Sequence, residues 1–155
     1  MKVYVASSWR NERQPAVVAA LREIGCEVYD FKNPGPGDNG FHWSEIDAEW
    51  KSWTPEQFAK ALEHPIAREG FGRDMTALMD ADLVVLVLPC GRSAHLEAGY
   101  GVGRDKTVFV LVEGDDYVPE LMYRMFDGIA LTLEKLVERV RLMFPSPTEA
   151  GEPTT

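Results

Sequence analysis

The sequence predicts a doubly wound α/β fold, in which helices cover both faces of a parallel sheet of about five strands. Short runs rich in β-branched residues alternate with segments of helical periodicity, the pattern of βαβ units. Two of these runs, DLVVLVL at 82–88 and TVFVLV at 107–112, are nearly continuous in apolar residues, which is typical of central strands buried on both faces. A length of 155 residues suits a single domain built around one such sheet.

The first part of the chain predicts a strand, a helix and a second strand. KVYVA at 2–6 predicts the first strand, and the segment 12–24 then places apolar residues at helical spacing. Gly25 predicts the end of that helix, because glycine readily takes a positive φ. EVYDF at 27–31 predicts the second strand. From 32 to 53 the composition changes to Gly, Pro, Asn and Trp, which ends the regular pattern.

The rest of the chain alternates helix and strand. Thr54 followed by proline is a good N-cap and first helical residue, and helical or strand-like spacing predicts the elements that follow. The tail at 145–155 is polar and Pro-rich, which predicts disorder, so we expect the domain to cover 1–144. The elements expected here are helices over 54–63, 65–79, 93–104 and 132–144 and strands over 82–88, 107–112 and 128–131.

Composition and charge limit the partners of the chain. The formal net charge is -9, whereas proteins that bind a phosphate backbone are usually basic, so a nucleic-acid polymer is not an expected partner. No stretch reaches the ~18 consecutive apolar residues of a membrane span, and the start lacks a signal peptide, so we expect a cytoplasmic protein without membrane contact. Cys26 and Cys90 have no metal-site spacing, so we expect two free thiols and neither a metal nor an organic cofactor.

The expected sheet is of the flavodoxin-like or Rossmann-like type, which binds ligands beyond the carboxyl ends of its strands, near the topological switch point. Three loops follow expected strands: SSWRN after the first, PGPGDNGFHW after the second and PCGRSAH after the third. Polar and aromatic residues gather in them. We expect most aromatic residues of 32–53 to close the domain or a subunit interface, while one or two can stack on a planar ring of a ligand.

The segment PCGRSAHLEAGYGVG at 89–103 contains the most informative residue, Glu97. It lies about one turn inside the expected helix, where the helix dipole favours an ionised carboxylate. An ionised carboxylate beside the anomeric carbon of a sugar can attack that carbon and form a glycosyl ester. Gly99 and Gly103 are expected to let the helix pack closely on the sheet. The alternative is an acid that only stabilises the start of the helix, which is a common use of glutamate.

Two further segments accompany LEAGYGVG: KVYVA at the first strand and RDMTALMDAD before the buried strand. Together the three resemble the nucleoside 2-deoxyribosyltransferase family, over about residues 1–112. The resemblance implies that Glu97 is the nucleophile and that Tyr4 helps to position its carboxylate. It also implies that Asp74 lies near the departing base and takes part in its protonation.

The chain departs from that family six residues before the nucleophile. Many of the transferases have an aspartate there that contacts the sugar hydroxyls, whereas this chain has Gly91, followed by Arg92 and Ser93. A guanidinium and a hydroxyl suit a phosphate or carboxylate, and the related 5′-monophosphate N-glycosidases use serine-rich and Arg-containing loops around their nucleotide phosphate. The predicted substrate-binding residues are therefore Ser7, Ser8, Arg10, Gly91, Arg92 and Ser93. Surface ion pairs for the arginines and helix capping for the serines are the alternative uses.

The resemblance implies cleavage of the N-glycosidic bond of a nucleoside or nucleotide, followed by transfer of the deoxyribosyl group to another free nucleobase. The departure at 91–93 favours an alternative, hydrolysis of a nucleoside 5′-monophosphate. A non-catalytic nucleotide-binding sensor domain is a third interpretation, because fold alone does not fix function. The resemblance also implies a homodimer or higher homo-oligomer, with 117–126 as a segment that either contributes to the neighbouring site or packs in its own core. His95 lies on another helical face than Glu97, so we expect it to be exposed or structural.

Overall fold

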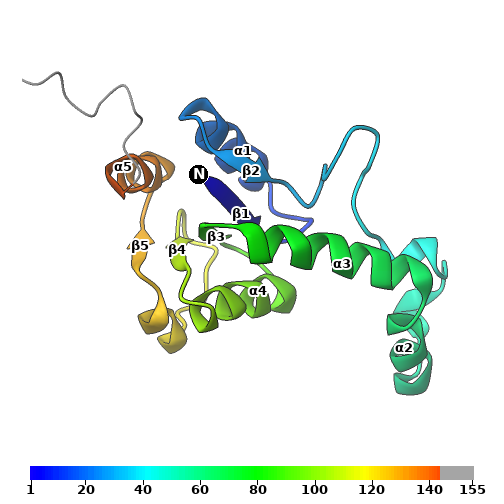
Figure 1. The fold of residues 1–155 in the computed structure, drawn as a ribbon. Helices are drawn as coiled ribbons and strands as arrows, with labels where there is room; N and C mark the ends of the chain where they lie inside the picture. The colour runs from blue at the N-terminus through cyan, green and yellow to red at the C-terminus, as the bar shows by residue number, and fades with distance from the viewer. Residues whose placement is uncertain (144–155) are drawn as a thin grey trace, which may run out of the picture. The chain divides into compact units, whose positions relative to one another are not determined.

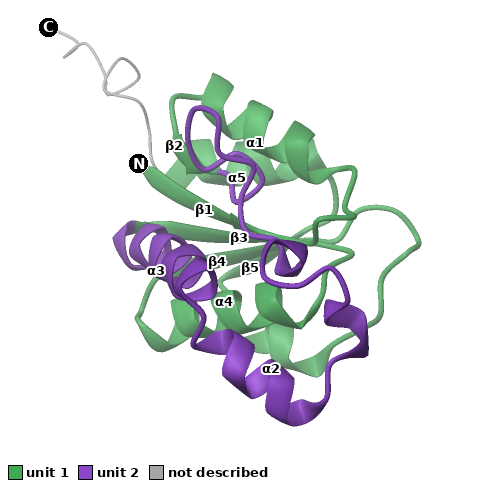
Figure 2. Ribbon diagram, turned by 90° about the vertical axis from the view of Figure 1, so that its right-hand side faces the viewer, with its two compact units in different colours: residues 1–29, 81–155 green, residues 30–80 purple. Residues whose placement is uncertain are grey.

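The computed structural model of the chain describes residues 1–143 (Figure 1), so the tail predicted at 145–155 lies outside the described residues. The chain divides into two compact units, which Figure 2 shows in different colours. Among the described residues, unit 1 comprises 1–29 and 81–143, and unit 2 comprises 30–80. In sequence, unit 2 is thus an insertion between the second and third strands. The single domain over 1–144 stays a prediction.

Unit 1 is a parallel sheet with helices on both faces (Figure 1). The strand order β2-β1-β3-β4-β5 confirms the predicted doubly wound parallel sheet of the flavodoxin-like type. Every predicted strand is present with only small differences at its ends, where assignments commonly vary. The strands are β1 (Lys2–Ala6), β2 (Glu27–Tyr29), β3 (Leu83–Val87), β4 (Thr107–Leu111) and β5 (Gly128–Ala130), and the helices are α1 (Gln14–Glu23), α4 (Arg92–Gly103), α5 (Leu133–Met143) and the short 3-10 helix η3 (Leu121–Met125).

The face of the sheet that α1 and α5 cover forms an apolar core. Side chains alternate along a strand, and Val3 and Val5 of β1 both point to this face. They belong to one buried cluster with Leu21 of α1 and Leu136 of α5. Helix α1 is followed by Gly25 with φ +86°, which confirms that this glycine ends the helix in the left-handed conformation.

The opposite face of the sheet is covered by α4, which approaches it closely. A Cβ atom on Gly101 would lie 3.0 Å from Cγ2 of Val84 and 3.2 Å from Cγ2 of Val108. The prediction that Gly99 and Gly103 allow the close approach is wrong, because a Cβ on either would meet no atom within 4 Å. Both point away from the sheet, while Gly101 lies on the buried stripe of the helix.

Unit 2 consists of two helices preceded by a segment with two single-turn 3-10 helices. Its elements are η1 (Trp43–Glu45), η2 (Trp50–Ser52), α2 (Pro55–Leu62) and α3 (Pro65–Asp80). Thr54 caps α2 as predicted: its hydroxyl accepts from the backbone N–H of Gln57 at 3.3 Å, and the Gln57 side chain accepts from the backbone N–H of Thr54 at 2.8 Å. Trp43 contacts three other rings of the unit edge-on: Phe41, Trp53 and Phe58. These aromatic residues therefore help to close unit 2 itself.

Candidate active site

The strand order places a topological switch point between β1 and β3. The chain leaves β1 for α1 on one face of the sheet and leaves β3 for α4 on the opposite face, so the two loops diverge at the carboxyl edge (Figure 1). The first loop carries Ser7, Ser8 and Arg10, and the second leads into 91–93. The predicted substrate-binding residues therefore lie at the ends of two neighbouring strands. The third predicted loop, 34–43, belongs to unit 2.

Asn11 connects these two loops. The residue is only 3% exposed, and its side-chain nitrogen donates to the carbonyl oxygens of Val87 at 3.2 Å and Pro89 at 3.0 Å. Its side-chain oxygen accepts from the backbone N–H groups of Arg13 at 2.8 Å and Gln14 at 3.2 Å, at the start of α1. Asn11 is not among the predicted site residues, although an asparagine just ahead of a helix is a known capping signal.

The two serines of the first loop both bind backbone groups. The Ser7 hydroxyl donates to the carbonyl oxygen of Val87 at 2.8 Å, and the Ser8 hydroxyl accepts from the backbone N–H of Arg10 at 3.2 Å. Neither bond caps α1, which begins at Gln14, so the alternative of helix capping is wrong and both hydroxyls hold the loop instead. Each hydroxyl can still make a further hydrogen bond, since Ser7 retains acceptor lone pairs and Ser8 retains a donor proton.

The start of α4 presents groups that suit an anion. Gly91 is the N-cap, and no side chain caps the first backbone N–H groups of the helix. Such N–H groups, at the positive end of the helix dipole, attract phosphates and carboxylates. Arg92 and Ser93 are exposed at this end. Within residues 1–143, neither Arg10 nor Arg92 forms an ion pair with a carboxylate.

Glu97 lies on the side of α4 that faces the sheet and is half-buried. At helical spacing it adjoins Ala94 and Ala98, which are buried against the strands. Its charge reaches the loop after β3, because burial and the nearby carboxylate of Glu97 raise the pKa of the Cys90 thiol to about 12. The helix begins five residues earlier, so Glu97 lies past the first turn. The dipole effect expected from the sequence is therefore weak at this position.

The other two predicted catalytic residues belong to different units. Tyr4 of β1 is fully buried and stacks on Tyr29 of β2, with ring centroids 5.4 Å apart. It alternates with Val3 and Val5, so it points to the sheet face that α4 covers. Asp74 lies half-buried on α3 in unit 2. Its role near the departing base stays a prediction.

His95 is held between the start of α4 and η3. Its Nδ1 lies 2.8 Å from the carbonyl oxygen of Gly91 and 3.6 Å from Sγ of Cys90, and its Nε2 lies 2.9 Å from the hydroxyl of Tyr123. The pKa of Tyr123 is raised to about 12, mainly by burial and to a lesser degree by the charges of Cys90 and Glu120. These contacts favour the predicted structural role of His95. No sequence signal pointed to Tyr123, because its partner is 28 residues away.

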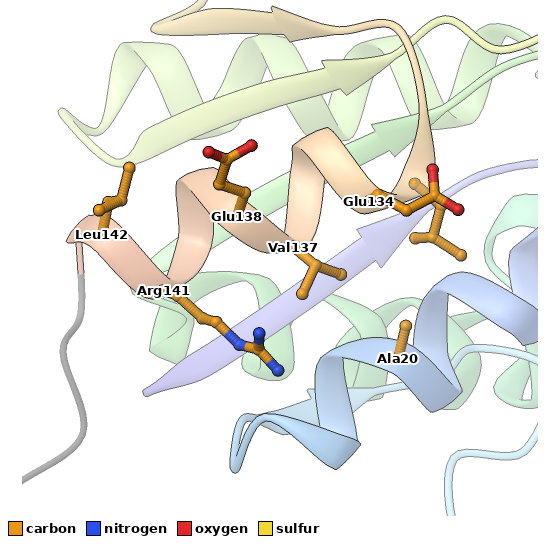
Figure 3. A pocket seen from close by; sticks show the side chains of 7 residues that line it. Ala20, Glu134, Val137, Glu138, Arg141 and Leu142 are labelled. Atoms are coloured by element: carbon orange, nitrogen blue, oxygen red, sulfur yellow. The ribbon is translucent and has the colours of Figure 1, made fainter. Parts of the chain in front are cut away.

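A groove between α1 and α5 involves none of the predicted site residues. It has a volume of about 640 Å³, and its lining includes Ala20 of α1 and, from α5, Glu134, Glu138 and Arg141 (Figure 3). Among the described residues, no three His, Cys, Asp or Glu side chains are grouped as a metal ion requires. Within 1–143 no helix combines the length and the apolar character of a membrane span.

No protein-family model and no curated protein sequence matches the chain. Solved structures do match. A conserved protein from Enterococcus faecalis V583 has a TM-score of 0.61 at 13% identity, covering 93% of this chain and 99% of that chain. A 2-deoxyribosyltransferase from the psychrotolerant bacterium Bacillus psychrosaccharolyticus has a TM-score of 0.53 at 18% identity, covering 88% and 90%. A CMP N-glycosidase from Clostridium botulinum has a TM-score of 0.49 at 17% identity, covering 93% and 100%.

At these identities the first two likenesses show the fold. The chain therefore shares its fold with these two proteins.

Proposed function

We propose that this chain cleaves the N-glycosidic bond of nucleosides or nucleotides, with Glu97 as covalent nucleophile. The position of Glu97 carries the proposal: its half-buried carboxylate lies on the sheet-facing side of α4, and its charge acts on the loop at the switch point. The LEAGYGVG segment and the fold likeness to a 2-deoxyribosyltransferase support this assignment.

The proposed reaction has two steps. A carboxylate oxygen of Glu97 forms a bond to C1′ of the sugar as the bond from C1′ to the base nitrogen breaks. The bonding electrons leave with the base, which takes up a proton from the residue we assign as its donor, Asp74. We assign Tyr4 to the positioning of Glu97. In the second step a nitrogen of another free nucleobase attacks C1′ as the bond from C1′ to the Glu97 oxygen breaks, and the proton of that nitrogen returns to Asp74. This completes deoxyribosyl transfer and restores both carboxyl groups. Neither step calls for a metal or an organic cofactor.

Hydrolysis of a nucleoside 5′-monophosphate is a second candidate, favoured by the groups around the start of α4. Arg10 and Arg92 make no ion pair within the described residues, and the first N–H groups of α4 have no side-chain cap. A phosphate would accept charge-assisted hydrogen bonds from both kinds of donor. Water then takes the place of the second base. The two candidates share the glycosyl ester of Glu97 and differ in the acceptor.

A substrate panel tests both candidates. Exchange of the base of a deoxynucleoside for a second free base would indicate transfer, whereas release of base from a 5′-monophosphate without an acceptor would indicate hydrolysis. Mass spectrometry after incubation with a 2-fluoro-2-deoxy nucleoside should show an adduct on Glu97, absent in Glu97→Gln and present in the control Glu23→Gln, whose side chain is exposed at the end of α1. Lack of base release from every substrate would contradict the proposal and favour a nucleotide-binding sensor.

We also propose that the chain forms a homodimer or higher homo-oligomer. In the segment 117–126, Tyr123 packs on its own chain, whereas four apolar side chains are exposed: Val118, Leu121, Met122 and Met125. Light scattering should give the mass of an oligomer, and Leu121→Lys should lower that mass. The control Leu142→Lys, on exposed Leu142 of α5, should not. A monomeric wild type would contradict this proposal.

A further inference from the structure

Tyr123 and His95 have no role in the proposed chemistry, yet both act on the loop at which the substrate is proposed to bind. The Gly91 carbonyl oxygen, 2.8 Å from Nδ1 of His95, can only accept a hydrogen bond, so Nδ1 carries the hydrogen. The Nε2 atom of the neutral ring is then an acceptor, and the Tyr123 hydroxyl, 2.9 Å away, donates to it. The Gly91 carbonyl therefore requires the Nδ1–H tautomer of His95, and the Tyr123 hydroxyl stabilises the same tautomer by donating to Nε2.

The selected tautomer orients a backbone N–H group. The carbonyl of Gly91 and the N–H of Arg92 belong to one planar peptide group and point in opposite directions. As the N-cap residue, Gly91 already directs its carbonyl along α4 to accept the first backbone bond of the helix. The bond from His95 adds a second restraint on this carbonyl, and the N–H is held with it. This N–H is the first of α4, and no side chain caps it. It is one of the donors that an anionic substrate group would meet.

We propose that Tyr123, acting through His95, is a positioning residue that directs the Arg92 N–H towards an anionic group of the substrate, of the kind that a 5′-phosphate provides. This inference rests on the proposed function for the identity of the substrate. Packing supports it: Tyr123 is 9% exposed, and its ring lies nearly parallel to those of His95 at 13° and Phe126 at 24°. The phenol thus has little freedom to point its hydroxyl elsewhere.

Two substitutions of His95 separate positioning from packing. His95→Asn places an amide nitrogen where Nδ1 lies and keeps a donor for Gly91, so KM for a deoxynucleoside 5′-monophosphate should stay within about threefold of wild type. His95→Gln places its amide nearer to Tyr123 and loses the bond to Gly91, so KM should rise about tenfold, as for one lost hydrogen bond, with kcat little changed. If the larger glutamine is tolerated as well as asparagine or better, the side chain only fills space and the proposal is overturned.

Tyr123→Phe tests the hydroxyl with the ring retained, and Tyr117→Phe is the control on a half-exposed tyrosine of the same segment. Nitrogen-15 NMR of the His95 ring should show the Nδ1–H tautomer in the wild type and the control. The share of the Nε2–H tautomer should rise in Tyr123→Phe, where only the Gly91 carbonyl still favours Nδ1–H. KM for the 5′-monophosphate should rise in Tyr123→Phe by about 3- to 10-fold, while KM for the nucleoside stays unchanged. An unaltered tautomer and an unaltered KM would overturn the proposal. The NMR measurement does not require turnover. If the wild type releases no base but its His95 tautomer depends on Tyr123, the proposed function is contradicted, whereas the positioning of Gly91 is not.

Discussion

The two faces of the sheet in unit 1 differ in chemistry. The face under α1 and α5 is lined by a continuous cluster of buried aliphatic and aromatic side chains, which extends from Val3 to Val140. On the face under α4, small residues let the helix approach the sheet closely. Polar side chains lie near the carboxyl edge of this face, namely Cys90, His95 and Glu97. The face under α1 and α5 therefore contributes mainly to stability. The face under α4 also holds polar side chains, which contribute less to stability than apolar packing does. Substitutions on the two faces should therefore separate activity from stability.

The largest effect is expected for Glu97→Gln. Loss of the proposed nucleophile should lower the rate of base release by roughly 10³-fold or more. The free energy of unfolding should change by no more than about 1 kcal/mol, because a half-buried amide of the same size replaces the carboxylate. Urea unfolding and a base-release assay on the same preparation measure both quantities. A variant that retains a tenth of the activity would assign the chemistry to another residue.

Leu136→Ala should lower stability and leave the rate of base release unchanged. Leu136 is fully buried in the cluster under α5, so its truncation should lower the free energy of unfolding by about 2–5 kcal/mol. Base release per folded molecule should stay the same, since the substitution lies on the face away from α4. Leu142→Ala, on the exposed side of the same helix, is the control and should change stability by less than about 0.5 kcal/mol. Equal losses in the two variants would argue against the core as described.

Gly101→Ala should affect both properties. The new methyl group meets Val84 and Val108 at distances that require α4 or the valines to move, which should cost about 1–3 kcal/mol of stability. A shift of α4 would move Glu97 with it, so base release should fall as well. Gly103→Ala, where a Cβ meets nothing within 4 Å, should leave both nearly unchanged. If Gly101→Ala lowers stability but not the rate, the position of α4 does not limit catalysis.

The smallest effect is expected from alkaline pH and should arise on the α4 face. Burial raises the pKa of Cys90 from 9.0 and that of Tyr123 from 10.0, each to about 12. The unfolded chain therefore loses these protons at lower pH than the folded chain does. Their contribution to stability is present in full below pH about 9 and is lost as pH rises towards about 12. Urea unfolding at several pH values should show this decline, and Cys90→Ser and Tyr123→Phe should flatten it. Leu136→Ala should lower the whole curve without changing its slope.

The fold was predictable because its signals are local. The runs at 82–88 and 107–112 became the central strands β3 and β4, whose residues are almost all buried. Gly25 and Thr54 marked helix ends through backbone conformation and capping, which depend only on near neighbours.

The site was predictable only in part, because much of it depends on contacts between distant segments. Glu97 was predicted from its motif and the family resemblance, and its role stays a prediction. The helix-dipole effect predicted for it is weak, because it lies past the first turn of α4. Asn11 binds Val87, 76 residues away in sequence, and Tyr123 binds His95, 28 residues away. No sequence pattern predicts contacts between residues so far apart. Likewise, spacing did not reveal which glycine of α4 faces the sheet, since that depends on how the helix is rotated against the strands.

The sheet order has a further consequence at its two margins. The outermost strands, β2 and β5, are only three residues long each. An outer strand exposes unpaired N–H and C=O groups that can recruit a strand from another molecule, which is a route to aggregation and amyloid. Strands this short offer few such groups. The chain is therefore a poor template for sheet extension, and copies of it that associate should do so through side chains rather than by continuing the sheet.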